Sequence, residues 1–271
     1  MHLKISHTTE YRYTEPVHYA LQRLRITPLS GPGQRVIDWR IRLEGAVEEV
    51  GYHDEFGNRI DLVSTSGGQL FTRITAEGLV ETSDLSGVTG PHTGFCPLWL
   101  YLRETPRTRP GRLLRELARA LPAGSDLEQM HALMGELNRA IDYRTGTTHT
   151  ETTAEQALEQ GYGVCQDHAH AMIAVARLNG LPARYVSGYL FMDGISEQAA
   201  SHAWAEIMLS GLGWVGFDAA NRICPDARYV RLATGLDYQG AAPVSGMRLG
   251  PSEEHLHVAL TVTDQQRQSQ S

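Results

Sequence analysis

The sequence predicts an α+β protein, in which an antiparallel β module precedes several helices and a second antiparallel sheet. Three observations lead to this fold class. Apolar and charged residues alternate within residues 1–90, apolar residues at helical spacing follow from about residue 113, and strand-like segments follow from residue 183. With 271 residues, 41% of them apolar, the chain can bury a substantial core. We expect a sandwich-like N-terminal β domain over residues 1–95, a core domain over 96–265 and a flexible tail over 266–271.

The N-terminal segment shows the two-residue periodicity of β-strands. Residues 37–44 alternate strictly between apolar and charged side chains, which places one face in a core and the other in water. Residues 3–13, 24–26 and 70–76 show the same pattern less cleanly, and the glycine and asparagine within 54–58 indicate a turn. The pattern predicts an antiparallel sandwich or barrel-like module. Its expected role is structural or substrate-guiding, because it contains no visible pairing of a nucleophile with a base.

Helical signals begin after a connector. Residues 91–110 are punctuated by prolines, which favour an extended chain. We expect one helix near residues 113–121, and a short helix through residue 158 that opens on the capping-box pattern of Thr153 and Gln156. Between them, Ser125 can cap a helix. Its apolar residues recur every three or four positions, which marks one buried face: Leu127, Met130, Met134, Leu137 and Ile141.

The second half continues with one more helix and then strands. The helix is expected over residues 166–178, and Asn179-Gly180 followed by Pro182 provides its stop signal. Strands are predicted over residues 183–190, 202–209 and 214–220, the last two joined by a hairpin turn at 210–213.

Composition and charge exclude several classes of protein. The net charge of −7 arises from 24 Lys and Arg against 31 Asp and Glu without a basic cluster, so we expect no nucleic-acid partner. No apolar run approaches the roughly 20 residues that span a bilayer. The opening residues lack the apolar core of a secretory signal, so we expect a cytoplasmic location. The 3 cysteines include no CxxC pair, which favours free thiols over a disulfide framework. A homodimer is expected only because dimers are common.

Cys165 is the first candidate catalytic residue. It follows two glycines, Gly161 and Gly163, and stands at the predicted start of a helix. There the unpaired backbone N–H groups and the positive end of the helix dipole favour a thiolate over a thiol. The neighbouring glycine at 163 would leave room for a substrate backbone. Taken alone, the same pattern is equally compatible with a small buried residue at a tight loop-to-helix junction.

The predicted hairpin supplies a histidine and a carboxylate. Side chains two apart on a strand face the same way, so His202, Trp204 and Glu206 share one face. With the turn near residues 211 and 212, Asp218 should lie opposite His202 or one diagonal step away, at a Cβ distance of roughly 5–8 Å. A thiol at a helix start, a histidine on one strand and an aspartate on the next are the parts of a catalytic triad.

Three motifs that carry these residues resemble the transglutaminase-like superfamily in sequence and in order. They are GVCQD at 163–167, SHAWAE at 201–206 and GWVGFD at 213–218. The opening residues 5–13, and residues 235–238 and 243–246 near the end, resemble a bacterial branch of this superfamily, whose members have an N-terminal β domain and are described as cysteine peptidases. One departure is the Ala219-Ala220-Asn221 that follows Asp218, where the branch more often has a proline and a threonine.

The resemblance implies a papain-like or transglutaminase-like core with a thiol triad of Cys165, His202 and Asp218. In these roles the thiolate attacks an amide carbonyl, the imidazole protonates the leaving amine, and the carboxylate orients the ring. The Cys165 amide would be one oxyanion donor, and Tyr143 is a candidate for the second. Trp204 could border the substrate groove. A core or lid role for Tyr143 and a packing role for Trp204 are the alternatives.

Two functional classes follow from these residues. The favoured one is a thiol enzyme acting on a peptide or another amide substrate through a thioester. Transfer of the acyl group to water makes it a peptidase or amidase, and transfer to an amine makes it a protein-glutamine acyltransferase. The other class is a non-catalytic binding or scaffold protein of the same fold. We expect no cofactor and no metal site, because Cys165, His168 and His170 cannot converge from one helix.

Overall fold

Strand β1 (His2–Leu24) organises the larger of two antiparallel sheets in the computed structural model, which describes residues 1–250 and 253–265. On one side β1 pairs with β4 (Arg59–Thr82), and on the other with β14 (Glu254–Asp264) and β13 (Val244–Leu249). Three further strands complete the sheet: β2 (Gln34–Glu44) and β3 (Val47–His53) pair with β4, and β9 (Glu197–Gln198) pairs with β14.

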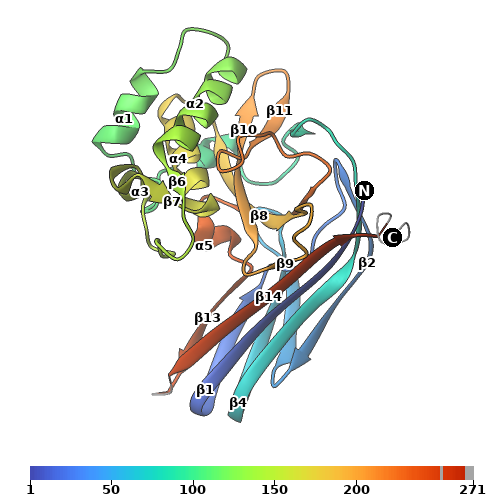
Figure 1. Ribbon diagram of the computed structural model, residues 1–271. Coiled ribbons are helices and arrows are strands. Elements are labelled where there is room, and N and C mark those ends of the chain that lie inside the picture. The colour runs from blue at the N-terminus through green and yellow to red at the C-terminus, as the bar shows by residue number, and fades with distance from the viewer. Residues whose placement is uncertain (251–252, 266–271) are drawn as a thin grey trace.

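Strands from the first and last parts of the described chain therefore share this sheet, and Figure 1 shows β1 and β14 side by side. The N-terminal strands are hydrogen-bonded into one sheet with β13 and β14, and the sandwich-like form expected for residues 1–95 stays a prediction. The alternation of apolar and polar residues along a strand shows that one face is buried, but it does not show which element covers that face. A second sheet and a layer of helices therefore give the same sequence pattern. Strands β13 and β14 come from the predicted core segment 96–265, and the division at residue 95 stays a prediction. The expected tail, 266–271, lies outside the described residues.

A β-bulge changes the buried face of β2. The pairing of β2 with β4 shifts between Val36 and Asp38, so Ile37 is 42% exposed, whereas Trp39 and Ile41 are half-buried against the core. The strict alternation predicted that Ile37 shares the inner face with Trp39. An extra residue in one strand turns the side chains before it to the opposite face relative to those after it, and sequence periodicity does not reveal it.

The second sheet has the strand order β12-β8-β10-β11-β5. The strands predicted from 183 and 202 are confirmed as β8 (Ala183–Leu190) and β10 (His202–Leu209). Strand β11 (Gly213–Phe217) ends earlier than the predicted residue 220, because Asp218 turns back to form a bridge with Ile223. The two outer strands, β12 (Tyr229–Gly235) and β5 (Val88–Gly90), were not predicted.

Helices cover one face of this second sheet (Figure 1). The predicted caps are confirmed: Ser125 and Thr153 each accept a hydrogen bond from the backbone amide three residues ahead, at the starts of two helices. The proline-rich connector contains one turn of 3-10 helix, η1 (Leu98–Leu102), where an extended chain was predicted. The other elements are α1 (Arg112–Arg119), α2 (Asp126–Ala140), α3 (Ala154–Gln160), α4 (Cys165–Leu178), α5 (Tyr238–Ala241) and the parallel pair β6 (Asp142–Tyr143) and β7 (Tyr162–Gly163).

Helix α4 lies at the centre of the main core. It packs against β10 and β8 and is buried nearly all round, which explains its small and apolar composition. Inner side chains of the larger sheet, including Leu3 and Val262, belong to the same apolar cluster. A buried hydrogen bond of 2.9 Å between His7 Nδ1 and the Tyr189 hydroxyl also joins the two sheets. Within the described ranges, no helix is both long and apolar enough to cross a membrane.

Candidate active site

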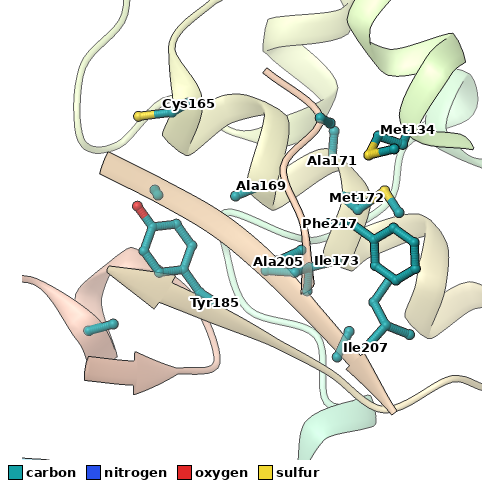
Figure 2. Close-up of a cluster of buried hydrophobic side chains, with 14 of the residues drawn as sticks. Met134, Cys165, Ala169, Ala171, Met172, Ile173, Tyr185, Ala205, Ile207 and Phe217 are labelled. Carbon is teal, nitrogen blue, oxygen red and sulfur yellow. The ribbon is translucent and has the colours of Figure 1, made fainter. Parts of the chain in front are cut away.

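Cys165 is the first residue of α4, and the loop before it is held by a buried carboxylate. Asp167 Oδ2 accepts hydrogen bonds from the Val164 amide at 2.7 Å and from the Thr148 hydroxyl at 2.8 Å. Figure 2 shows the Cys165 sulfur at the end of the helix, pointing away from the apolar side chains that surround the rest of α4. The first amides of a helix have no intrahelical acceptor, so the thiol lies where backbone N–H groups can meet a negative charge.

His202 and Asp218 form a direct pair. His202 Nε2 lies 2.6 Å from Asp218 Oδ2, and both side chains are largely buried. The register of β10 with β11 pairs Ala205 with Phe217, so Asp218 follows the last strand residue and is one diagonal step from His202. This is one of the two predicted placements. Because Nε2 is engaged by the carboxylate, Nδ1 is the ring nitrogen left to interact with the sulfur of Cys165.

The charge state of His202 reflects both neighbours. Burial lowers the pKa of the ring, but the negative charge of Cys165 and hydrogen bonds with Asp218 and Cys165 outweigh it and raise the pKa to about 10. Burial alone would also raise the pKa of Asp218, but the hydrogen bond and the charge of His202 lower it below its usual range. The arrangement therefore favours a protonated His202 ring beside the ionised Asp218 carboxylate at neutral pH.

Two residues that the sequence did not single out as site residues hold Asp218. The Tyr229 hydroxyl donates to Asp218 Oδ2 at 2.7 Å, and the Asn221 side-chain amide donates to the same oxygen at 2.7 Å. The backbone amide of Asn221 donates to Oδ1 at 3.2 Å. An asparagine three residues after an aspartate is a local turn signal that could have revealed Asn221. Tyr229 lies on β12, a strand with no periodic signal in the sequence, and only the fold brings it here.

Tyr143 lies beside the thiol on the solvent side. Its side chain is 54% exposed, on the short strand β6 that pairs with Gly163. Burial of the hydroxyl, the negative charges of Cys165 and Asp218 and a hydrogen bond with Cys165 raise the pKa of Tyr143 to about 12. The hydroxyl therefore stays protonated at neutral pH and can donate a hydrogen bond next to the sulfur.

The structure gives packing reasons for the other two candidate substrate-binding residues. A Cβ at Gly163 would approach Asp167 Oδ2 to 2.7 Å, so the glycine makes room for the carboxylate that caps the loop. Trp204 is 3% exposed and stacks on His202 with ring centroids 6.4 Å apart. The roles of both residues in binding substrate stay predictions.

The two histidines that follow Cys165 lie on α4, and both side chains are buried. The ring nitrogens of His168 lie 2.9 Å from the Val164 carbonyl oxygen and 3.0 Å from that of Ile141. His170 Nε2 accepts the Tyr238 amide at 3.1 Å. Among the residues that the structure describes, no group of three or more His, Cys, Asp or Glu side chains could hold a metal ion.

The remaining thiols lie in different surroundings from Cys165. Cys96 and Cys224 are both free, and burial raises the pKa of each. No imidazole is hydrogen-bonded to either sulfur in the described part of the chain; the Cys96 thiol donates to the Glu55 carbonyl oxygen at 3.2 Å. These two cysteines are therefore internal references for the reactivity of Cys165.

Family models match two parts of this chain. Residues 115–219, which include Cys165, His202 and Asp218, match the model of the transglutaminase-like superfamily. Residues 3–81 match the model of the bacterial transglutaminase-like N-terminal region. The chain belongs to the transglutaminase-like superfamily. More narrowly, it is a member that carries the bacterial N-terminal region in front of the core.

Similar proteins are known in several bacteria. An uncharacterized protein of Mycobacterium leprae is 28% identical over 277 residues, covering 96% of this chain and 98% of that protein. A protein-glutamine gamma-glutamyltransferase of Pseudomonas aeruginosa is 28% identical over 200 residues, covering 66% of this chain and 28% of that enzyme. The crystal structure of a protein named "Putative Cysteine Protease" from Cytophaga hutchinsonii has the same fold, with a TM-score of 0.76 and 22% identity over 97% of this chain and 91% of that one. Together with the family match, these likenesses support an enzyme.

Proposed function

We propose that the protein is a thiol enzyme that cleaves amide bonds through a Cys165-His202-Asp218 triad, with a thioester acyl-enzyme as intermediate. The observation that carries the proposal is the buried His202–Asp218 pair, 2.6 Å apart, whose ring also interacts with the thiol at the start of α4. A nucleophile, a base and an orienting carboxylate in this relation are the requirements for acyl transfer.

In the proposed reaction the Cys165 thiolate attacks the carbonyl carbon, and the carbonyl π electrons move to oxygen. The Cys165 amide and the Tyr143 hydroxyl stabilise this oxyanion. The C–N bond then breaks, and the His202 imidazolium gives its proton to the departing amine. A water that loses a proton to His202 attacks the thioester, releasing the carboxylic acid and regenerating the Cys165 thiolate beside the His202 imidazolium. The expected substrate is a peptide or another amide.

Transfer to an amine is the second candidate activity. The same thioester yields a new amide when an amine replaces water, and the relative named protein-glutamine gamma-glutamyltransferase favours including it. A non-catalytic scaffold is the third possibility from the sequence. The expected cytoplasmic location and homodimer are independent of this choice and stay predictions.

Trapping the acyl-enzyme tests the proposal. The full chain is mixed with a peptide library at low pH, quenched and digested, and the peptide carrying Cys165 is examined by mass spectrometry. We expect an acyl adduct on this cysteine alone. Its release with and without a primary amine, such as cadaverine, then distinguishes hydrolysis from transfer. A folded protein that forms no adduct across the library would support the scaffold alternative.

The pH dependence of alkylation provides a second test, independent of substrate. Because the raised pKa of His202 keeps an imidazolium beside the sulfur, iodoacetamide should label Cys165 nearly as fast at pH 6 as at pH 8. In His202→Ala the rate should fall about 80-fold over the same range, as for an ordinary thiol with a pKa of about 8.5. Peptide mapping separates Cys165 from Cys96 and Cys224. An ordinary thiol profile for Cys165 in the wild type would contradict the proposed ion pair.

Tyr229 should act as a positioning residue through Asp218. In Tyr229→Phe the carboxylate loses one donor while it keeps those of His202 and Asn221, so we expect kcat to fall about tenfold, which corresponds to a hydrogen bond worth about 1.4 kcal/mol. The acidic limb of the pH profile should move to higher pH, since the Tyr229 hydroxyl helps to lower the pKa of Asp218. Tyr189→Phe, which removes the buried contact with His7, is the matched control. Equal losses of kcat in both variants would indicate a general packing effect.

A further inference from the structure

A cavity of about 250 Å³ lies on the face of the second sheet opposite α4. Side chains alternate along β10: Ala203 and Ala205 pack in the main core with α4, whereas Trp204 and Glu206 line the cavity. The rest of its wall comes from residues 29–34 and 56–58 of the larger sheet and its loops, and from residues 83–89, which lead into β5. Cys165 and His202 do not line it. The cavity therefore contains neither the nucleophile nor the base of the proposed acyl transfer.

Buried charges face this cavity. Glu206 is 1% exposed and accepts hydrogen bonds from two guanidinium groups, those of Arg184 and Arg231. Burial alone would raise the pKa of Glu206, but the charges of Arg231 and Arg184 lower it, so the carboxylate is ionised. Arg184 also lies over the Trp214 ring, 4.1 Å from its centroid, which holds its guanidinium in place.

This cluster has an excess of positive charge. Two guanidinium groups share the single negative charge of Glu206. The other acidic residue of the lining, Asp226, is paired with Arg228 through contacts of 2.7 and 3.0 Å. The Nε of Arg231 is buried and has no acceptor among the described residues. Nε itself lies below the surface, but the Arg231 side chain as a whole is 27% exposed and lines the cavity, so its exposed part can contact an anion there.

We propose that this cavity binds a small carboxylate with an apolar body, and that Arg231 receives the carboxylate group. One uncompensated positive charge matches a monoanion, and the nearby Glu206 and Asp226 would repel a dianion such as phosphate. The planar guanidinium fits the two oxygens of a carboxylate. Apolar side chains of the lining, among them Leu85, Val88 and Trp204, would surround the body of the ligand.

The ligand in this cavity would be separated from the His202–Asp218 pair only by the side chains of Trp204 and Tyr229. Trp204 lines the cavity and stacks on His202, and Tyr229 lines the cavity and donates to Asp218. The site is nevertheless defined by its own charges and does not depend on whether Cys165 reacts. Its test can therefore be separated from that of the proposed enzyme activity.

The experiment is a ligand-observed NMR titration of the full chain with 4-methylpentanoate, its neutral amide and inorganic phosphate. We expect the carboxylate to bind at least tenfold more tightly than the amide or phosphate, and its affinity to fall at least tenfold in Arg231→Gln. Cys165→Ala and Arg248→Gln, which removes an arginine from the distant strand β13, should bind as the wild type does. No binding to the folded wild type, equal binding of the amide or phosphate, full binding in Arg231→Gln, or loss in Cys165→Ala would each overturn the proposal.

A second variant decides the case in which Arg231→Gln does not fold. Leu85 lies at the edge of the cavity and is 43% exposed, so Leu85→Trp fills the space without altering the charged cluster. Its folding is checked by circular dichroism and thermal unfolding. Loss of carboxylate binding in this folded variant supports the cavity as the site, whereas unchanged binding places the ligand elsewhere and overturns the proposal.

Discussion

Cys165→Ala should abolish turnover and acyl-enzyme formation, with a loss of kcat on the order of 10⁶-fold, the scale seen when a catalytic nucleophile is removed. The reason is chemical: alanine has no group that can form the thioester, and the neighbouring His202 and Asp218 cannot replace it. The measurement is kcat on the substrate found by trapping, together with the mass of the intact protein. The fold should survive, since truncating one small side chain costs about 1 kcal/mol.

Cys224→Ala is the matched control for this prediction. It removes a thiol that has no imidazole partner among the described residues, so turnover and adduct formation should be unchanged. Substantial activity in Cys165→Ala would exclude this cysteine as the nucleophile. A loss of activity in both alanine variants, with lowered unfolding temperatures, would indicate an effect on the fold and not on the chemistry.

Asp218→Asn has the second largest expected effect. In serine proteases the same exchange of the orienting carboxylate for an amide lowers kcat about 10⁴-fold with the geometry intact. Here Asp218 accepts at Oδ2 from His202, Tyr229 and Asn221, so an amide that keeps one oxygen can retain part of this network. It loses the negative charge that stabilises the imidazolium. We therefore expect kcat to fall roughly 10³- to 10⁴-fold.

The same variant should change the pH dependence of Cys165 alkylation. The hydrogen bond and charge of Asp218 raise the pKa of His202, so without them the imidazolium deprotonates at lower pH. An imidazolium then lies beside the sulfur only up to a lower pH than in the wild type, so the upper pH limit of this state falls. Asp61→Asn is the control, because Asp61 is a buried carboxylate that accepts from Arg59 in the larger sheet. An Asp218→Asn enzyme with wild-type kcat would show that His202 needs no orienting carboxylate.

Much of the local structure could be predicted because its signals are local. Helix caps at Ser125 and Thr153, the helix that starts at Cys165 and the strand that starts at His202 each follow from short motifs and periodicity. The diagonal relation of His202 to Asp218 could be predicted because a tight hairpin turn sets the register of the two strands that it joins.

Other features depend on contacts between distant segments, and no short pattern encodes them. Tyr229 reaches Asp218 because β12 lies next to β8 at the edge of the second sheet. In the larger sheet, β14 pairs with β1, although nearly the whole chain separates the two strands in sequence. The bulge at Ile37 has the same origin, since an extra residue becomes visible only against the partner strand. The pairing of Arg184 and Arg231 with Glu206 likewise requires three strands to be side by side.

The sequence alone predicted the fold class, the thiol at a helix start, and a histidine and an aspartate brought together by a hairpin. The tertiary structure decided how these groups are charged, what holds the aspartate and where a second cavity lies. The physical reason is that backbone periodicity and capping act over a few residues, whereas pKa values and cavities depend on burial and on every charge that the fold brings near.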